Sequence, residues 1–200
     1  MFKSKEIRWF SQTENSSIRK WFEENSYTFE NSDPRKDFYL PLKEKEDIGI
    51  KLREGSIEIK HRTERSVKEK ILSRAEGYFE KYIKWSFSSA EEDSLYQEIV
   101  EEEKYDWVGV SKERLAIKLK KDPDAGIVRI NSDEFITSGC QIEYTRVKLK
   151  DEVWYTFGIE WFGEEELNFD LSLIDEILGE TDLKAENSMG YAEFLNERLQ

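Results

Sequence analysis

Short segments in which apolar and charged side chains alternate constrain the fold of this 200-residue chain more than any other feature of its sequence. In residues 47–53 and 57–62, isoleucine or leucine at every second position is followed mostly by lysine, arginine or glutamate. This period of two is typical of a β-strand with one apolar and one polar face. Because Glu54-Gly55 lies between the two segments, we expect them to form a hairpin.

The same pattern, followed along the whole chain, predicts about eight strands in mostly consecutive antiparallel order and four helices. We expect the strands at residues 5–10, 37–40, 47–53, 57–62, 77–88, 105–110, 114–119, 140–149 and 153–162. The helices are expected at residues 13–25, 89–103, about 171–178 and 190–199, with Thr13 and Ser89 as the first two N-caps. No repeat or linker interrupts the sequence, which predicts one α+β domain over residues 1–200 with a helical tail from about residue 170.

Two arrangements of these strands are compatible with the alternation. In an open antiparallel sheet, the charged faces would lie in water. In a closed barrel, the charged faces would line the interior and the apolar faces would pack outward against helices. The charged faces mix acids with bases, which favours the barrel. They carry Glu6, Arg8, Lys51, Arg53, Glu58, Lys60, Arg62, Glu143 and Glu160.

Composition restricts the partners of the chain. With 31 Lys and Arg against 44 Asp and Glu, the formal net charge is −13. The surface is expected to repel duplex nucleic acid and anionic membranes, although basic residues gathered in one cleft would still bind an anion.

Cys140 is the only cysteine, which excludes an intramolecular disulfide and a cysteine-based zinc cluster. The first residues lack the apolar core of a signal peptide, so we expect a cytoplasmic protein.

Basic and acidic side chains in one cleft suit a phosphorylated ligand. Arginine and lysine bind phosphate oxygens. Carboxylates hold a hard divalent cation, which neutralises the remaining phosphate charge. The alternative is a purely structural role, with Lys51 and Arg53 as a solvated edge pair and with Glu58, Lys60 and Arg62 in cross-strand ion pairs.

Several short motifs follow one another along nearly the whole chain. They are Glu6-Ile7-Arg8, Asp37-Phe38-Tyr39, Lys51-Leu52-Arg53, Ile57-Glu58-Ile59-Lys60, Ile159-Glu160 and the segment from Ser188 to Leu195. Their order resembles the CYTH superfamily, the triphosphate tunnel metalloenzymes, which include class IV adenylyl cyclases and thiamine, inorganic and RNA triphosphatases. The resemblance implies an α+β fold in which an eight-stranded antiparallel β-barrel with flanking helices surrounds a tunnel.

The chain departs from the pattern of this family at the acids. Family members carry Glu-x-Glu-x-Lys in the first strand, whereas here one acid is replaced by Arg8 or by Ser4, depending on which acid Glu6 represents. The late Glu-x-Glu is also reduced, because Gly158 stands two residues before Glu160. The basic residues of the pattern are kept, so the resemblance implies an anion-binding tunnel more strongly than a metal site.

We therefore predict a tunnel that binds a triphosphate-bearing or polyphosphate small molecule. Its expected phosphate contacts are Arg8, Lys51, Arg53, Lys60 and Arg62. The expected ligands of Mg²⁺ or Mn²⁺ are Glu6, Glu58, Glu143 and Glu160, of which Glu6 and Glu160 would also be catalytic in a metal-dependent triphosphatase. Further candidates for the tunnel wall, dependent on strand register, are Arg114, Lys118 and Arg146.

Two other functions remain open from the sequence. One is a non-catalytic, polyanion-binding or regulatory member of the same fold that has lost its metal site. The other is a structural or interaction protein whose interior charges are neutralised by internal salt bridges.

Overall fold

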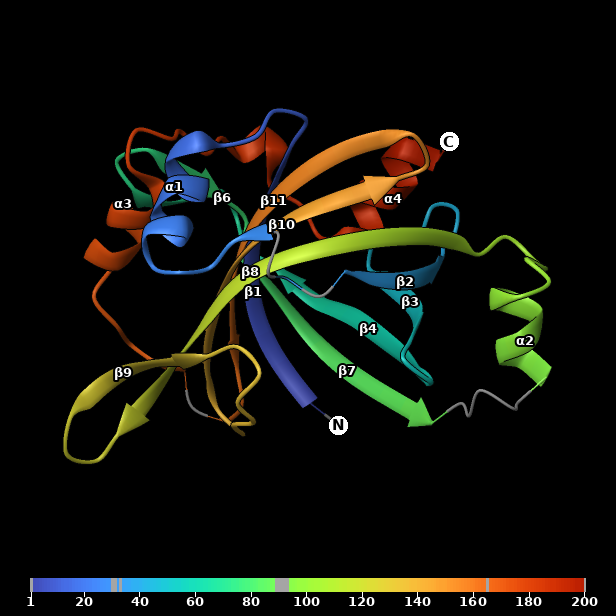
Figure 1. The fold of residues 1–200 in the computed structure, drawn as a ribbon, viewed down its shortest axis with the longest axis horizontal. Helices are drawn as coiled ribbons and strands as arrows, with labels where there is room; N and C mark the ends of the chain where they lie inside the picture. Colours follow the sequence, from blue (N-terminus) through green and yellow to red (C-terminus); the bar gives the residue numbers. More distant parts are fainter. Residues whose placement is uncertain (1, 30–31, 33, 89–93, 165, 200) are drawn as a thin grey trace.

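A closed antiparallel β-barrel forms the body of the molecule in a computed structural model that describes residues 2–29, 32, 34–88, 94–164 and 166–199 (Figure 1). Within these residues, eight strands pair in the order β10-β11-β1-β7-β4-β3-β2-β8, and β8 pairs with β10 to close the ring. The strands are β1 (Phe2–Ser11), β2 (Arg35–Leu40), β3 (Ile48–Arg53), β4 (Ser56–Arg65), β7 (Glu80–Ser88), β8 (Val108–Asp122), β10 (Gly139–Leu149) and β11 (Glu152–Phe162). The α+β barrel expected from the sequence is confirmed.

Shorter elements flank the barrel. Strand β9 (Gly126–Asn131) extends the sheet beyond β8, and β5 (Glu69–Leu72) pairs with β6 (Ala75–Gly77) in a separate ribbon. The helices are α1 (Ser16–Glu24), α2 (Ser94–Val100), α3 (Ser172–Leu178) and α4 (Tyr191–Leu199), with a short 3₁₀ helix at Ala185–Asn187. Among the described residues, none of the helices is long and apolar enough to span a membrane.

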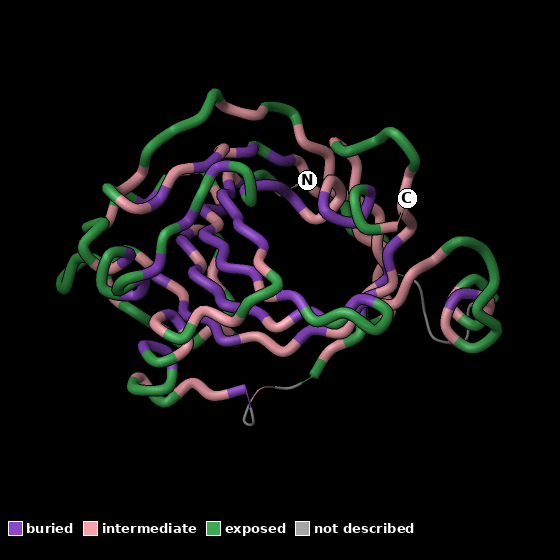
Figure 2. The backbone as a smooth tube through the Cα atoms, turned by 90° about the horizontal axis from the view of Figure 1, so that it is seen from above, coloured by how far each residue is buried: buried purple, intermediate pink, exposed green. Residues whose placement is uncertain are grey.

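The two faces of the barrel wall differ in chemistry, as the alternation requires. Glu6 lies opposite Glu160 on one side and opposite Glu80 on the other, whereas its neighbour Ile7 lies opposite Ile159. Cross-strand partners share a face, so one face is charged and the other apolar. The apolar face points outward and joins α1 and α3 in the main core, and buried segments follow the strands in Figure 2.

A second apolar cluster lies where α4 packs against one end of the barrel. Phe194 of α4 is fully buried and stacks on Phe10, with ring centroids 4.0 Å apart. Phe10 shares a strand face with Glu6 and Arg8, so the interior face changes from charged to apolar toward this end. The cluster also contains Val110, Val147, Leu149, Trp154, Met189 and Leu195. Helix α4 therefore covers an apolar end of the interior.

Several element boundaries differ from the expected ones. The two strands expected at 105–110 and 114–119 are one strand, β8, because the intervening Lys112 faces the interior, where Asp37 pairs with it. Residues 126–131, for which the sequence pattern predicted no strand, form β9. The first helix begins at Ser16, with Asn15 rather than Thr13 as its N-cap residue. The second begins by Ser94, and the predicted cap Ser89 lies outside the described residues.

Candidate functional site

A cavity of about 150 Å³, open to solvent, lies inside the barrel. Among the described residues, the wall carries eight basic side chains and four carboxylates. The basic ones are Arg8, Arg35, Lys51, Arg53, Lys60, Lys84, Lys112 and Arg114, and the acidic ones are Glu6, Glu58, Glu143 and Glu160. In a chain of net charge −13, this interior is positively charged.

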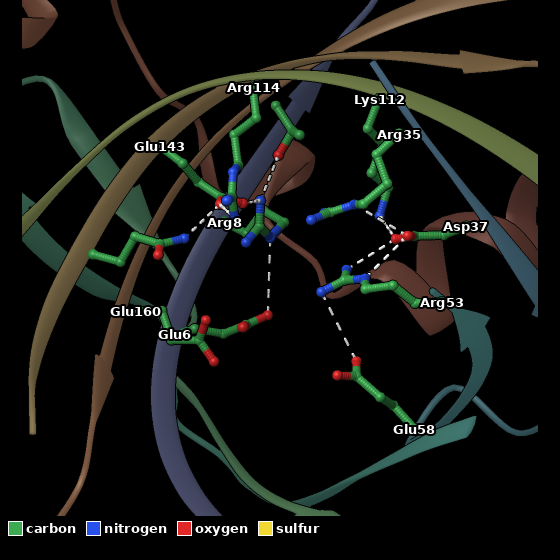
Figure 3. Close-up of polar contacts among 12 residues, drawn as sticks. Glu6, Arg8, Arg35, Asp37, Arg53, Glu58, Lys112, Arg114, Glu143 and Glu160 are labelled. Carbon is green, nitrogen blue, oxygen red and sulfur yellow. Dashed lines mark hydrogen bonds and ion pairs between the residues drawn. The ribbon is translucent and has the colours of Figure 1, made fainter. Parts of the chain in front are cut away.

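Three of the basic side chains share one buried carboxylate, Asp37 of β2 (Figure 3). Arg53 donates to both of its oxygens, at 3.0 and 2.9 Å. The Arg35 Nε and Lys112 Nζ atoms lie 3.1 Å from these oxygens. Although burial raises the pKa of Asp37, Lys112 and Arg53 outweigh it and hold that pKa far below the usual range. One negative charge thus faces three positive charges, which leaves cationic capacity on this wall.

Lys51 lies on the neighbouring strand β3, and the positive charge of this wall affects its pKa. Its ammonium group lies 2.6 Å from Glu58, whose other oxygen lies 3.6 Å from Lys84. Burial, reinforced by the charge of Arg53, lowers the pKa of Lys51 to about 8. Burial also lowers the pKa of Lys112 well below its usual value, although Asp37 opposes the effect. These two amines would gain from a further negative charge in the cavity.

The other three carboxylates of the cavity lie around Arg8, in a group separate from that around Asp37 (Figure 3). Two of them also contact Lys60. The Arg8 Nη1 atom lies 2.8 Å from Glu143, and Arg8 Nε lies 3.9 Å from Glu6. Lys60 donates to Glu6 and, at 3.3 Å, to Glu160. Burial lowers the pKa of Lys60, but Glu160 and Glu6 outweigh it and raise that pKa above its usual value. Both cations are therefore held in the charged form.

These carboxylates, as they lie, do not fit the metal site that the resemblance implied. Each of the four expected metal ligands forms an ion pair with an arginine or a lysine. These ligands are Glu6, Glu58, Glu143 and Glu160. Among the described residues, no group of three or more histidine, cysteine, aspartate or glutamate side chains is placed to hold a metal ion. A divalent cation would have to displace one of these basic side chains before the carboxylates could bind it.

A threonine hydroxyl and two stacked tyrosine rings also line the cavity. The Thr145 hydroxyl is buried, and among the described residues it has no hydrogen-bond partner. The Tyr39 and Tyr191 rings stack with centroids 5.8 Å apart, and the Lys112 ammonium lies 3.7 Å from the centre of the Tyr191 ring. An unpaired buried hydroxyl is costly, and a ligand oxygen in the cavity would satisfy it.

The interior brings together four of the five expected phosphate contacts. Arg8, Lys51, Arg53 and Lys60 line the cavity. Arg62 instead lies 2.5 Å from Glu80 and 3.0 Å from Glu193 of α4, so it joins the helix to the barrel outside the cavity lining.

Among the three candidates that depended on register, only Arg114 lines the cavity. Arg146 pairs with Glu113 at 2.6 Å, and Lys118 donates to the backbone carbonyl of Glu134. The expectations missed Arg35, Lys84 and Lys112. The face of Lys84 was predictable, because polar and apolar residues alternate along residues 83–88 of β7, whereas the chain around Arg35 and Lys112 gives no clean alternation. The motif Asp37-Phe38-Tyr39 was the available signal for that wall, since Asp37 organises three of its cations.

Comparison with known proteins gives no assignment for this chain. No family model matches the sequence, and no curated protein matches it. A function must therefore be argued from the charges and contacts of the cavity.

Proposed function

We propose that the barrel interior binds a small molecule bearing a polyphosphate or triphosphate group. The observation that supports this most directly is the excess of positive charge in the cavity. Eight basic side chains face four carboxylates there, and counting the buried Asp37 still leaves an excess of three positive charges. Buried charges are costly unless they are paired, so an interior of this kind is better matched by a ligand that carries several negative charges.

The chemistry of the wall favours phosphate oxygens over a single carboxylate. Arginine presents planar pairs of N–H donors that match phosphate, and lysine adds a compact charge. Arg35, Arg53, Lys51 and Lys112 lie close together around Asp37 and Glu58, and Arg114 and Lys84 extend the basic wall. A chain of phosphate groups would contact several of these side chains at once. The Thr145 hydroxyl, which has no hydrogen-bond partner among the described residues, adds a neutral donor.

The resemblance to the CYTH superfamily is part of this proposal. The closed barrel agrees with the fold that the resemblance implied, but many barrels share an architecture without sharing a function. What supports the functional part is the basic wall. The carboxylates support the metal-dependent part less, because all four expected metal ligands are already ion-paired. We therefore favour a non-catalytic polyanion-binding protein over a triphosphatase.

Calorimetric titration of tripolyphosphate into the full chain, in the presence of a chelator, tests the binding proposal. Arg114→Met removes a cavity cation whose side chain is 32% exposed, and Arg146→Met is the matched control on β10, 34% exposed and paired outside the cavity. A hydrogen bond to a charged group contributes about 1.5–3 kcal/mol. We expect about 10- to 150-fold weaker binding in Arg114→Met and little change in Arg146→Met. Equal effects of the two variants, or no binding by the wild type, would refute the proposal.

A phosphate-release assay with Mg²⁺ or Mn²⁺ separates the binder from the triphosphatase. Binding without release supports the non-catalytic function. Metal-dependent release that is lost in the Glu6→Gln/Glu160→Gln double variant would support the hydrolase instead, with these residues in the roles that the resemblance implied.

A further inference from the structure

The guanidinium group of Arg8 lies among the carboxylates that were expected to hold a metal. Only 6% of its side chain is exposed, and it lies 2.8 Å from Glu143 and 3.9 Å from Glu6. On its other sides it donates to the Thr156 hydroxyl at 3.3 Å and stacks over the Tyr191 ring. Four groups from four elements thus fix one positive charge at this place.

The strand opposite Arg8 is shaped to admit this side chain. Arg8 on β1 pairs directly with Gly158 on β11. A Cβ atom at position 158 would lie 2.8 Å from the guanidinium carbon and from Nη1, and 2.9 Å from Nη2. Any residue larger than glycine would therefore push the guanidinium out of its place. Glycine at 158 and arginine at 8 form one structural unit.

The charge of Arg8 is permanent. A guanidinium group keeps its proton in proteins, and the carboxylates of Glu143 and Glu6 lie against it. Unlike a bound Mg²⁺ or Mn²⁺, this cation cannot dissociate, and chelators do not remove it. Together with Lys60 and Arg114, it neutralises the carboxylates around it.

From these contacts we infer that Arg8 is a built-in cation in the place of a divalent metal, and that it makes ligand binding independent of metal. The inference rests on the proposed function for the identity of the ligand, but its metal-binding consequence does not. In wild-type protein, Glu6 and Glu143 are unavailable to a metal ion. Mg²⁺ added with tripolyphosphate should weaken binding, because it competes for the anion in solution.

Titration with Mn²⁺ alone tests the exclusion of metal without any phosphate ligand. We expect no saturable binding to the wild-type chain, followed by calorimetry and by the electron paramagnetic resonance signal of free Mn²⁺. Arg8→Met keeps a side chain of similar length but removes the positive charge between Glu6 and Glu143, so this variant should bind Mn²⁺ at least about tenfold more tightly than the detection limit that the wild-type titration sets. Arg8→Met/Glu143→Gln is the matched control and should lose that gain.

Each result of these titrations bears on the inference. The inference is overturned if the wild-type chain binds Mn²⁺ saturably and Glu6→Gln or Glu143→Gln abolishes this binding. This test does not depend on whether the Arg8 variants fold. A folded Arg8→Met chain that gains no Mn²⁺ affinity would overturn it as well. If tripolyphosphate fails to bind the wild type while the Mn²⁺ results hold, the proposed ligand is wrong and the role of Arg8 remains. If tripolyphosphate binds only with Mg²⁺, the ligand stands and the inference fails.

Discussion

Affinity for a polyanion is expected to fall as the pH rises through 8, because Lys51 loses its proton there. Lys51 lines the cavity, and burial together with the neighbouring charge of Arg53 lowers its pKa to about 8 from 10.5. A bound polyphosphate would favour the charged form and raise that pKa again. Above pH 8, binding must therefore take up a proton, and this uptake lowers the observed affinity.

The size of the effect follows from the pKa. At pH 7 about nine-tenths of unliganded chains carry a protonated Lys51, and at pH 9 about one-tenth do. If the liganded chain keeps the proton throughout, the association constant falls about tenfold over this interval, equivalent to about 1.4 kcal/mol. Arg53 makes no such contribution, because its guanidinium remains charged over the whole range.

Calorimetric titration of tripolyphosphate between pH 7 and pH 9, in buffers of different ionisation enthalpy, measures both the affinity and the proton uptake. The control is Lys51→Arg, which keeps a positive charge at position 51 at every pH tested. Titration of the ligand itself affects both proteins alike, so the difference between them isolates Lys51. Equal pH dependence in the two proteins would refute the assignment of the low pKa to this cavity lysine.

Two further predictions concern stability. Burial raises the pKa of Glu58, but Lys51 and Arg53 outweigh it and lower that pKa from 4.5 to about 2. The charged Glu58 therefore stabilises the folded state above pH 4.5, and this stabilisation is lost as the pH falls toward 2. Glu58→Gln should therefore reduce the free energy of unfolding by about 3 kcal/mol at pH 7 and by little near pH 2, and equal losses in urea denaturation at both pH values would contradict this. Phe194→Ala should cost about 3–5 kcal/mol, because this ring of α4 is fully buried against Phe10. Phe135→Ala, at a side chain that is 90% exposed, should change the urea midpoint little. A similar midpoint for both variants would count against an essential packing role of α4.

Alternation of side chains predicted the interior face because it depends on one local property, the two-residue period of a strand. Once Lys51 and Arg53 share a face, Glu58 and Lys60 on the paired strand follow from the hairpin register. The same logic could not assign Lys112. Farther along β8, Leu115, Ile117 and Leu119 alternate with polar or small residues. Around Lys112, however, residues 111–114 are all polar, so this segment carries no polar–apolar period by which to choose a face.

Pairing between charges was beyond the sequence for a different reason. Arg62 lies on the charged face of β4, as the alternation predicted, but its partner Glu193 is 131 residues away on α4. The position of that helix depends on packing of Phe194 against Phe10, which no local pattern records. Which charges stay available to a ligand is therefore decided by tertiary contacts, even where the face of each strand is predictable.

Arg8 and Gly158 illustrate how two apparent losses in a sequence can be one change in a structure. Along the chain they stand 150 residues apart, and each replaces an acid in the pattern that the resemblance implied when Glu6 is taken as the first acid of that pattern. In the barrel they are directly paired, and the absence of a side chain at 158 makes room for the guanidinium at 8. Glutamate at both positions would remove one positive charge and add two negative ones, which would cancel the interior's excess of three. A neutral interior would need an added cation to hold a polyphosphate, whereas this chain supplies the positive charge itself.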